Sequence, residues 1–251
     1  MIRVRDVRVS FNGRAVLQGV NLDVPHGKRT VVLGKNGCGK SVLLKAISGL
    51  IPLSGGSIWI NDLSLEDFFR QREHPGGSGI MLAYVFQKGG LFDSMNVFDN
   101  VAFGLRRMKM NEESVHRTVI GALASVGLAG SEYKLPSELS GGMQKRVGLA
   151  RAICLNPEII LYDDPAAGLD PILSDAIADL ILEITGKYAT TSIVVTHDLN
   201  VARKIADFVA LLHDGVIVYH DTVDAFFSRT NEFSRQFIEG DTEGPIVEQA
   251  M

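Results

Sequence analysis

The segment Gly34-Lys35-Asn36-Gly37-Cys38-Gly39-Lys40-Ser41 decides how the rest of the sequence is interpreted. It follows a short apolar, β-branched run, Thr30–Leu33, and precedes a helical pattern that starts at Lys40. A glycine-rich turn at this place presents backbone N–H groups to an anion, and the helix adds its positive end. The pattern G-x-x-x-x-G-K-[ST] therefore predicts a loop that holds the phosphates of ATP, and a glycine-rich turn without a ligand is the alternative.

Three side chains of this loop have distinct expected roles. Lys40 can reach the β- and γ-phosphates, and the Ser41 hydroxyl can ligate Mg²⁺. Cys38 lies among oriented N–H groups, which could activate its thiol, although a small tolerated side chain is the simpler interpretation. The predicted nucleotide contacts in the loop are Gly34, Lys35, Asn36, Gly37, Cys38, Gly39, Lys40 and Ser41.

Composition narrows the class of protein. The chain has 251 residues, of which 46% are hydrophobic and 22% charged, as in an ordinary folded domain. The net charge of −4 argues against a nucleic-acid partner, which usually requires a basic face. Two cysteines imply no disulfide framework and fit a reducing, cytoplasmic setting. No apolar run is long enough to span a membrane, so an action on membranes would need a spanning partner.

Periodicity along the chain predicts an α/β fold. Residues 2–11 and 16–24 alternate as two antiparallel strands joined by the turn Asn12-Gly13. Residues 97–128 are mostly helical by pattern. From residue 159 onward, apolar strands alternate with helices, which indicates a parallel sheet covered by helices. Further expected elements are a strand at 57–60, a flexible loop at 75–79, strands at 159–162, 192–196 and 208–212, helices at 172–185 and 200–205, and a hairpin at Asp214-Gly215.

The strand Ile159–Tyr162 ends in Asp163. Because parallel strands deliver their last residues to one edge of the sheet, Asp163 is expected near the phosphate loop, where it would hold Mg²⁺ directly or through water. Taken alone, such a run is as often only a core strand. Combined with the loop, it predicts a metal-dependent nucleotide site.

The segment Leu139-Ser140-Gly141-Gly142-Met143-Gln144 opens another predicted helix. Ser140 suits a helix N-cap, and the two glycines leave backbone N–H groups open to an anion. Together with the phosphate loop and Asp163, this segment resembles the signature of ATP-binding-cassette (ABC) ATPases. The resemblance covers nearly the whole chain.

The resemblance assigns roles to four more positions. Phe11 matches the aromatic residue that stacks on adenine, and Gln87 matches the glutamine that touches Mg²⁺ and reports to a membrane partner. Ala167-Gly168-Leu169-Asp170 matches the loop that crosses between subunits, and His197 matches the switch histidine that reads the γ-phosphate. Each residue alone could be an ordinary core or surface side chain. Their order along the chain argues against that.

The family resemblance implies a fold and a mechanism. The fold is a P-loop NTPase core with a parallel sheet, an N-terminal antiparallel β subdomain and an inserted helical subdomain at about 92–155. It would form one domain, 1–240, followed by a tail at 241–251. A second copy, facing head to tail, would cover the γ-phosphate with Ser140, Gly141 and Gly142, so that ATP joins the two copies and hydrolysis releases them. The implied cofactors are ATP and Mg²⁺, with Ser41, Gln87 and Asp163 as the metal ligands.

One position departs from the family pattern. The residue after Asp163 is normally a glutamate that polarises the attacking water, and here it is Asp164. Its reach is shorter by one methylene, and a displacement of about 1 Å can cost on the order of 10² in rate. A native but slow site, an engineered residue and a site that mainly binds ATP are all compatible with this change. We expect residual catalysis by Asp164, His197 and Lys40.

Several stretches resemble one branch of the family, the ATPases of the Mla phospholipid-transport system and related Mce-type lipid transporters. They are Leu91–Val101, Leu135–Met143, Phe237–Gly240 and Gly244-Pro245. The resemblance implies an MlaE-type permease, an MlaD-type lipid-binding protein and an MlaB-type small subunit as partners. It places the chain at the cytoplasmic face of the inner membrane. The apolar residues of Leu91–Phe98 suit a groove for a permease helix, or simple packing.

Three other functions remain open from the sequence. One is an importer ATPase for another small solute, and one is a soluble ABC ATPase of translation, DNA repair or Fe–S assembly. The third is a nucleotide-gated binding module with weak hydrolysis, which only Asp164 supports.

Overall fold

The computed structural model describes residues 1–73 and 81–246, so the loop expected at 75–79 lies outside the described residues. The chain divides into two compact units. The first unit comprises Met1–Gly79 and Thr191–Met251, and the second comprises Ile80–Thr190. The expected division into one domain, a helical subdomain and a tail follows different boundaries and stays a prediction.

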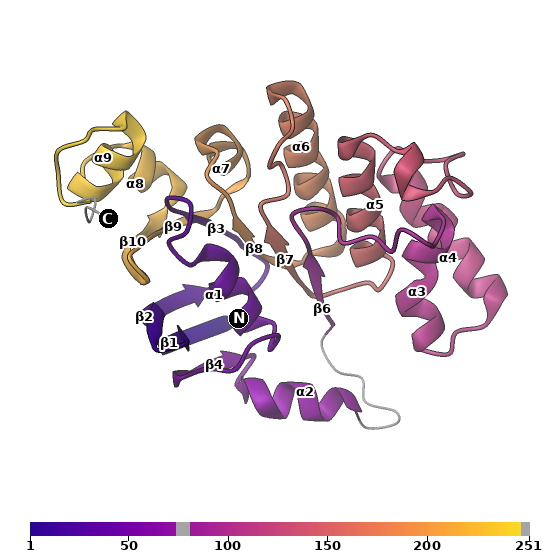
Figure 1. Cartoon of the computed structure of the whole chain (residues 1–251), viewed down its shortest axis with the longest axis horizontal. Coiled ribbons are helices and arrows are strands. Elements are labelled where there is room, and N and C mark those ends of the chain that lie inside the picture. The colour runs from indigo at the N-terminus through magenta and orange to yellow at the C-terminus, as the bar shows by residue number, and fades with distance from the viewer. Residues whose placement is uncertain (74–80, 247–251) are drawn as a thin grey trace. The chain divides into compact units, whose positions relative to one another are not determined.

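An antiparallel sheet forms the N-terminal part of the first unit (Figure 1). Its strands are β1 (Ile2–Phe11), β2 (Arg14–Val24), β4 (Gly55–Ile60) and β5 (Leu63–Ser64), in the order β2-β1-β4-β5. Apolar residues such as Val4 and Val20 are fully buried, while polar residues alternate toward solvent. The expected turn is confirmed, because Asn12 and Gly13 both have positive φ, as a tight hairpin requires.

Parallel strands form the second sheet region of the first unit. Strand β3 (Arg29–Leu33) lies between β9 (Phe208–His213) and β8 (Thr191–Val195) and is parallel to both. Strand β10 (Val216–Thr222) pairs antiparallel with β9 through the expected turn at Asp214-Gly215. The carboxyl ends of β3 and β8 therefore meet at one edge.

The helices of the first unit are α1 (Lys40–Ile47), α2 (Leu65–Glu73), α7 (Leu199–Ile205), α8 (Val223–Phe227) and α9 (Glu232–Glu239). Helices α1 and α7 were predicted from the sequence, and the other three were not. Helix α8 has only five residues, and α2 and α9 are mostly polar, so none of the three shows a clear apolar period.

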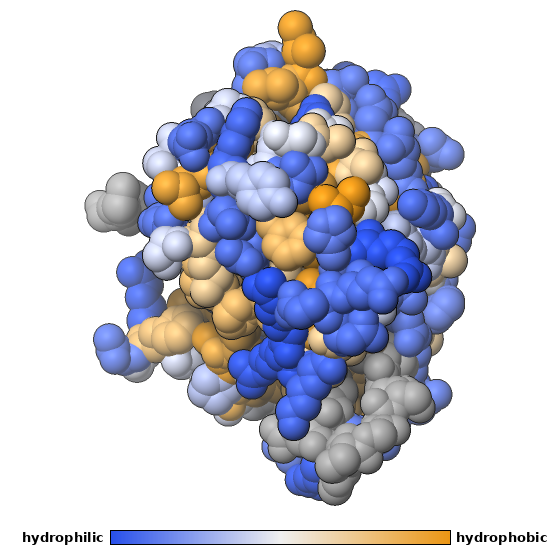
Figure 2. All heavy atoms as spheres, turned by 90° about the vertical axis from the view of Figure 1, so that its right-hand side faces the viewer, coloured by the Kyte–Doolittle hydropathy of each residue, from blue (hydrophilic) through white to orange (hydrophobic). Residues whose placement is uncertain are grey.

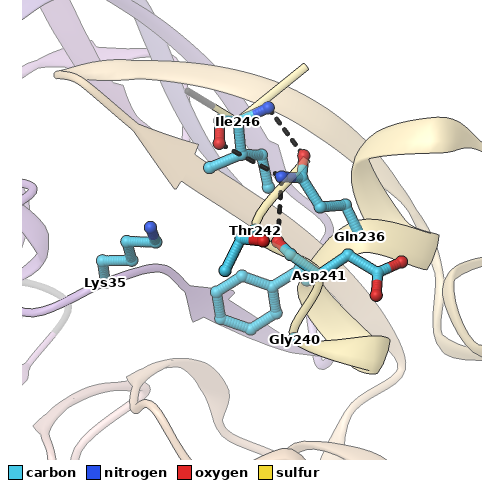
Figure 3. A pocket seen from close by; sticks show the side chains of 7 residues that line it. Lys35, Gln236, Gly240, Asp241, Thr242 and Ile246 are labelled. Carbon is cyan, nitrogen blue, oxygen red and sulfur yellow. Dashed lines mark hydrogen bonds between the residues drawn. The ribbon is translucent and has the colours of Figure 1, made fainter. Parts of the chain in front are cut away.

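The buried side chain of Gln236 in α9 forms hydrogen bonds with the chain that follows this helix (Figure 3). Its amide nitrogen donates to the carbonyl oxygens of Asp241 (3.1 Å) and Ile246 (3.2 Å), and its amide oxygen accepts from the Ile246 nitrogen (2.7 Å). Gly244 has a φ of +149° and approaches the Gln236 amide too closely for any Cβ. The beginning of the predicted tail is thus ordered, and with Lys35 it lines a pocket of about 240 Å³.

The second unit combines two parallel strands with helices. Strand β6 (Leu82–Val85) pairs parallel with β7 (Ile159–Asp163). The helices are α3 (Val97–Arg107), α4 (Glu112–Ser125), the 3₁₀ turn η1 (Pro136–Glu138), α5 (Gly141–Ile153) and α6 (Pro171–Tyr188). Asn96, Asn111, Ser140 and Asp170 cap the four α-helices.

In both units, strands alternate with helices as the periodicity predicted. The middle of the chain is helical from α3 to α5, with no strand among the described residues of that stretch. No helix in the described residues is both long and apolar enough to cross a bilayer.

Candidate functional site

The phosphate loop of the first unit joins β3 to α1, as predicted. Gly34, Gly37 and Gly39 have φ values of +155°, +82° and +108°, which only glycine adopts without strain. A Cβ on Gly34 would lie 2.4 Å from the Leu212 carbonyl oxygen, so the loop rests directly on the backbone at the end of β9. This geometry leaves no room for side chains at the base of the loop.

Lys40 closes the loop from within. Its ammonium donates to the carbonyl oxygens of Gly34 (2.7 Å) and Lys35 (2.8 Å), and the residue is only 9% exposed. Ser41 follows in the first turn of α1. The Lys40 ammonium and the N-terminus of α1 thus lie together in the phosphate loop. Both are positively charged, fully or in part, and suit the binding of a polyphosphate.

Cys38 is half-buried in the loop and its thiol is free. Burial raises the pKa of this thiol more strongly than the nearby Lys40 ammonium lowers it. The possibility of an activated thiol is therefore not supported. The interpretation of Cys38 as a small side chain that fits the loop agrees with this direction.

A pocket of about 450 Å³ adjoins the loop in the first unit. It is lined by Arg14, Ala15, Val16, Gln18, Gly37, Cys38, Asp214 and Gly215. Phe11 pairs with Arg14 across the β1–β2 hairpin, and its ring is 45% exposed. Opposite residues of an antiparallel pair share a face, so Phe11 lies on the face of the hairpin that carries Arg14. An exposed aromatic ring there suits a nucleobase better than a core role.

His197 follows β8 by two residues and is exposed. The nitrogen of the intervening Thr196 donates to the Val32 carbonyl oxygen, so β8 ends beside the strand that leads into the phosphate loop. Asp198 fixes the direction of the chain by capping α7 through the nitrogens of Asn200 and Val201. His197 is thus brought to the same edge as the loop, as the sequence analysis expected.

The second unit brings Gln87 and Asp163 to one edge. Val85 pairs with Tyr162 in the parallel β6–β7 ladder, so each of the two site residues follows a paired strand end. Asp163 is 6% exposed, and its Oδ2 accepts a hydrogen bond of 2.8 Å from the Tyr84 hydroxyl. Burial and the Asp163 carboxylate both raise the pKa of Tyr84, so the hydroxyl remains a donor.

Asp164 is 8% exposed and has a φ of +46°. Aspartate and asparagine tolerate this left-handed conformation better than longer side chains do. Its carbonyl oxygen accepts from the Ala167 nitrogen in the turn that follows. The local backbone therefore accommodates the short acid that departs from the family pattern.

The segment Ser140–Gly142 begins α5. The Ser140 hydroxyl accepts from the Met143 nitrogen at 3.3 Å, which confirms the expected N-cap. Gly141 faces open space, and a Cβ on Gly142 would contact Leu173 and Leu169. At the start of α5, Gly141 is therefore exposed and carries no side chain, whereas Gly142 is buried beside Leu169 and Leu173.

Asp170 has a structural partner that the sequence analysis did not anticipate. Its carboxylate caps α6 by accepting from the Leu173 nitrogen at 2.9 Å. Lys145 of α5 donates to the Ala167 carbonyl oxygen and thereby holds the 167–170 loop against the signature helix. Burial lowers the pKa of Lys145, and the neighbouring Asp164 carboxylate opposes that shift.

Tyr84 and Lys145 are functional candidates that sequence reasoning missed. Neither belongs to a motif, and each contacts its partner across a long separation along the chain: 79 residues for Tyr84 and 22 for Lys145. The only signal for Tyr84 is its place in a short strand that runs into Gln87.

The described residues contain no group of three or more His, Cys, Asp or Glu side chains placed to hold a metal ion. The predicted ligands Ser41, Gln87 and Asp163 supply one hydroxyl, one amide and one carboxylate. Mg²⁺ is usually held by one or two carboxylates together with substrate phosphates and water. The donor set therefore fits Mg²⁺ bound with a nucleotide.

The family model described as "ABC transporter" matches residues 17–167 of the chain. The chain is 37% identical to the intermembrane phospholipid transport system ATP-binding protein MlaF of Escherichia coli K12, covering 98% of this chain and 91% of that protein. It is 39% identical to the chloroplastic protein TRIGALACTOSYLDIACYLGLYCEROL 3 of Arabidopsis thaliana, covering 98% of this chain and 75% of that protein.

Among solved structures, the chain resembles the ATP-binding cassette MJ0796 in a dimeric post-hydrolysis state bound to ADP and Pi. The TM-score is 0.77 at 28% identity, over 89% of this chain and 99% of that one. This likeness confirms the predicted α/β cassette fold. The family match over residues 17–167 includes the phosphate loop, Asp163 and the segment Ser140–Gly142.

Proposed function

The chain belongs to the ABC transporter family, and from that premise we propose that it is the ATP-hydrolysing subunit of a transporter that moves phospholipids between inner and outer membranes. The observation that carries this proposal is the 37% identity to E. coli MlaF across 98% of the chain. An ATPase with this phosphate loop needs a membrane partner to move lipid, since no described helix can span a bilayer.

In the proposed site, the first unit receives the nucleotide. Phe11 stacks on the base, and the backbone of Gly34–Ser41 surrounds the phosphates while the Lys40 ammonium compensates their charge. The pocket of about 450 Å³ beside Gly37 and Cys38 has room for a nucleoside. Lys40 would exchange its carbonyl partners for phosphate oxygens without leaving the loop.

Ser41, Gln87 and Asp163 would hold Mg²⁺, which neutralises charge on the phosphates during transfer. The Tyr84 hydroxyl keeps Asp163 oriented. Asp164 orients the attacking water, and His197 contacts the γ-phosphate. Asp164 is buried, so bulk solvent is excluded from its carboxylate. The carboxylate is therefore held in a fixed geometry toward the attacking water.

A second copy would complete the site. The start of α5 is lined by Gly141 and Gly142, whose backbone N–H groups belong to the first turn and would face an anion, while Ser140 accepts from the Met143 N–H group. Related cassettes are known as dimers bound to ADP and Pi. We propose the same head-to-tail pair here, with Ser140, Gly141 and Gly142 of one copy facing the nucleotide of the other. Asp170 would contribute through the shape of its loop, because its carboxylate caps α6.

A groove of the second unit is the proposed docking site for the permease. It has a volume of about 590 Å³ and is lined by Ser94, Met95, Asp99, Phe103, Arg106 and Arg107. The Phe92 and Phe103 rings lie 4.9 Å apart and are each 41% exposed. Figure 2 views the side of Figure 1 that carries α3 and α4, and apolar surface there adjoins strongly hydrophilic surface. An amphipathic helix fits such a surface.

Two features define what this groove accepts. The fully buried Asn100 fixes the backbone of the segment 92–96 beside the groove. Its side-chain amide forms hydrogen bonds with the backbone of Phe92, Met95 and Asn96. Arg106 is neutralised by Asp99 and Glu112, whereas the Arg107 side chain has no ion pair within the described residues. A permease helix with an apolar face and one carboxylate would match the groove and its free positive charge.

We further propose an MlaE-type permease as the docking partner, together with an MlaD-type lipid-binding protein and an MlaB-type small subunit. The chain would then lie at the cytoplasmic face of the inner membrane, attached through the permease. These assignments rest on the resemblance to the ATPases of the Mla system, which the 37% identity to E. coli MlaF supports.

Purification of the complex from native membranes tests this function. The chain should co-purify with a multispanning permease, and lipid extraction with mass spectrometry should recover phospholipid at a defined ratio to the complex. Recovery of a polar solute importer instead of lipid, or of the chain alone from the soluble fraction, would contradict the proposal. A Lys40→Ala complex is the control for ATP-dependent release of the lipid.

A further inference from the structure

Arg151, on the inner side of α5, binds the turn that follows Gln87. Its Nη2 donates to the Gly89 carbonyl oxygen at 2.9 Å, and its Nη1 donates to the Gly90 carbonyl oxygen at 2.8 Å. A planar guanidinium that grips two consecutive carbonyls fixes both the position and the orientation of the turn. Arg151 is partly buried, and this burial lowers the pKa of its guanidinium.

The same turn and helix also meet backbone to backbone. Gly89 and Gly90 have φ values of +73° and +58°. A Cβ on Gly89 would lie 3.0 Å from the Gln144 carbonyl oxygen, and a Cβ on Gly148 would lie 3.1 Å from the Gly89 carbonyl oxygen. No flexible side chain separates the two segments at these points. A displacement of the turn must therefore displace α5 or break the contact.

This contact joins two parts of the proposed mechanism within one unit. Gln87 opens the turn, and the strand before it is tied to Asp163 by the Tyr84 hydroxyl. Helix α5 starts at the segment Ser140–Gly142, and Gln144, whose carbonyl oxygen faces Gly89, follows Ser140 by about one helical turn. Arg151 thus joins the turn that follows Gln87 to the helix that begins at the segment Ser140–Gly142.

We propose that Arg151 is a positioning residue that transmits movement of the Gln87–Gly90 turn to the signature segment Ser140–Gly142. The inference rests on the proposed function, because it gives the turn a nucleotide and a permease to respond to. Arg151 touches neither nucleotide nor metal in this scheme. It acts by making the turn and α5 move as one body, so that docking at the groove and closure on a second copy are coupled.

A neighbouring arginine provides a matched control. Arg146 lies on the same helix, is also partly buried, and donates to a backbone carbonyl, that of Val126, at 3.3 Å. It differs in its partner, which is the end of α4 and not the Gln87 turn. If Arg151 only stabilises α5, its replacement and that of Arg146 should have the same consequences.

The experiment compares Arg151→Lys and Arg151→Met with Arg146→Met in the isolated chain and in the purified complex. For Arg151→Met we expect the ratio of the complex kcat to the isolated-chain rate to fall about 10-fold, with KM for ATP changed less than about 3-fold. Arg151→Lys keeps the charge without the planar fork and should be intermediate. Arg146→Met should retain the ratio. An unchanged ratio in Arg151→Lys and Arg151→Met, or an equal loss in Arg146→Met, would overturn the proposal.

A second measurement needs no permease. Hydrogen exchange of the isolated chain is followed with and without Mg-ATP at the amides of residues 87–91 and 140–144. The unaltered chain should be protected in both segments, and Arg151→Lys only in the first. Equal protection of residues 140–144 in both proteins would refute the transmission. If the permease fails to change the ATPase rate of the unaltered chain, the proposed function fails, and the exchange result still decides the role of Arg151.

Discussion

The phosphate loop of the first unit and the Asp163–Asp164 pair of the second unit are constructed differently. The loop is determined by eight consecutive residues, with positive φ at its glycines and a lysine that bonds to carbonyls five and six residues away. The carboxylate pair depends on distant partners, since Tyr84 reaches Asp163 across 79 residues. Lys145, from α5, interacts electrostatically with Asp164.

This difference separates binding from turnover. A local loop can hold phosphate as soon as its strand and helix form, whereas the carboxylates acquire their geometry only when the whole second unit is packed. Substitutions in the loop should therefore change ATP affinity, and substitutions around the carboxylates should change rate or coupling with little effect on affinity.

The largest expected effect tests the loop. Lys40→Ala should weaken Mg-ATP binding about 100-fold, because it removes a buried charge-assisted contact and leaves two carbonyls without their donor. Isothermal titration measures the affinity. Lys35→Ala is the control, since that side chain is exposed and only its backbone belongs to the loop, so it should change affinity less than about 3-fold. Equal losses in the two variants would mean that the ammonium of Lys40 has no special role.

A smaller effect is expected at the carboxylate pair. Asp164→Glu should raise kcat of the assembled complex about 10-fold, because the added methylene restores reach toward the attacking water. The φ of +46° at residue 164 suits aspartate better than glutamate, and this strain limits the gain in rate. We also expect the free energy of unfolding to fall by about 1 kcal/mol. Steady-state ATPase assays and thermal unfolding measure the two quantities. No rise in rate would mean that reach does not limit turnover.

The same contrast explains what could be predicted from the sequence. The phosphate loop, the Asn12-Gly13 turn and the Ser140 cap were predictable because each depends on a few adjacent residues with a specific backbone requirement. The pairing of β6 with β7, the Tyr84–Asp163 bond and the Arg151 fork join segments far apart, and no local pattern encodes them. Gln236 belongs to this second class, because its role depends on how the last described residues fold back onto α9.

The helices that the sequence analysis missed have a related explanation. Helix α8 has five residues, too few for an apolar period to emerge, and α9 has only Phe233, Phe237 and Ile238 as apolar residues. Their stability comes from packing, as with the fully buried Phe226. The positive φ of Asp164 was equally inaccessible, since aspartate occurs in many conformations.

The groove of the second unit is where we expect the ATPase to be coupled to the permease. Phe92→Asp should lower permease-stimulated ATPase about 5-fold by placing a charge on the docking surface, while the isolated chain keeps its affinity for ATP. The fold should persist, because Asn100 holds this segment through its backbone and the side chain is 41% exposed. Met95→Asp should behave alike. Leu50→Asp, at another exposed apolar position in the first unit, should have no effect, and undisturbed co-purification and transport in Phe92→Asp would refute the docking site.

The smallest effect concerns the thiol inside the loop. Because burial raises the pKa of Cys38, the thiolate is scarce at neutral pH, and alkylation by iodoacetamide should accelerate as the pH rises beyond the range of an ordinary thiol. Mg-ATP should slow this labelling about 3-fold or more, since phosphate held by the loop covers Cys38 and adds negative charge beside it.

Cys154 is the internal control: burial raises its pKa to about 12, so it should remain unlabelled. Peptide mass spectrometry resolves the two cysteines. Equal rates for Cys38 with and without Mg-ATP would mean that the nucleotide does not cover the loop as proposed, which would weaken the view that binding is a local property of residues 34–41.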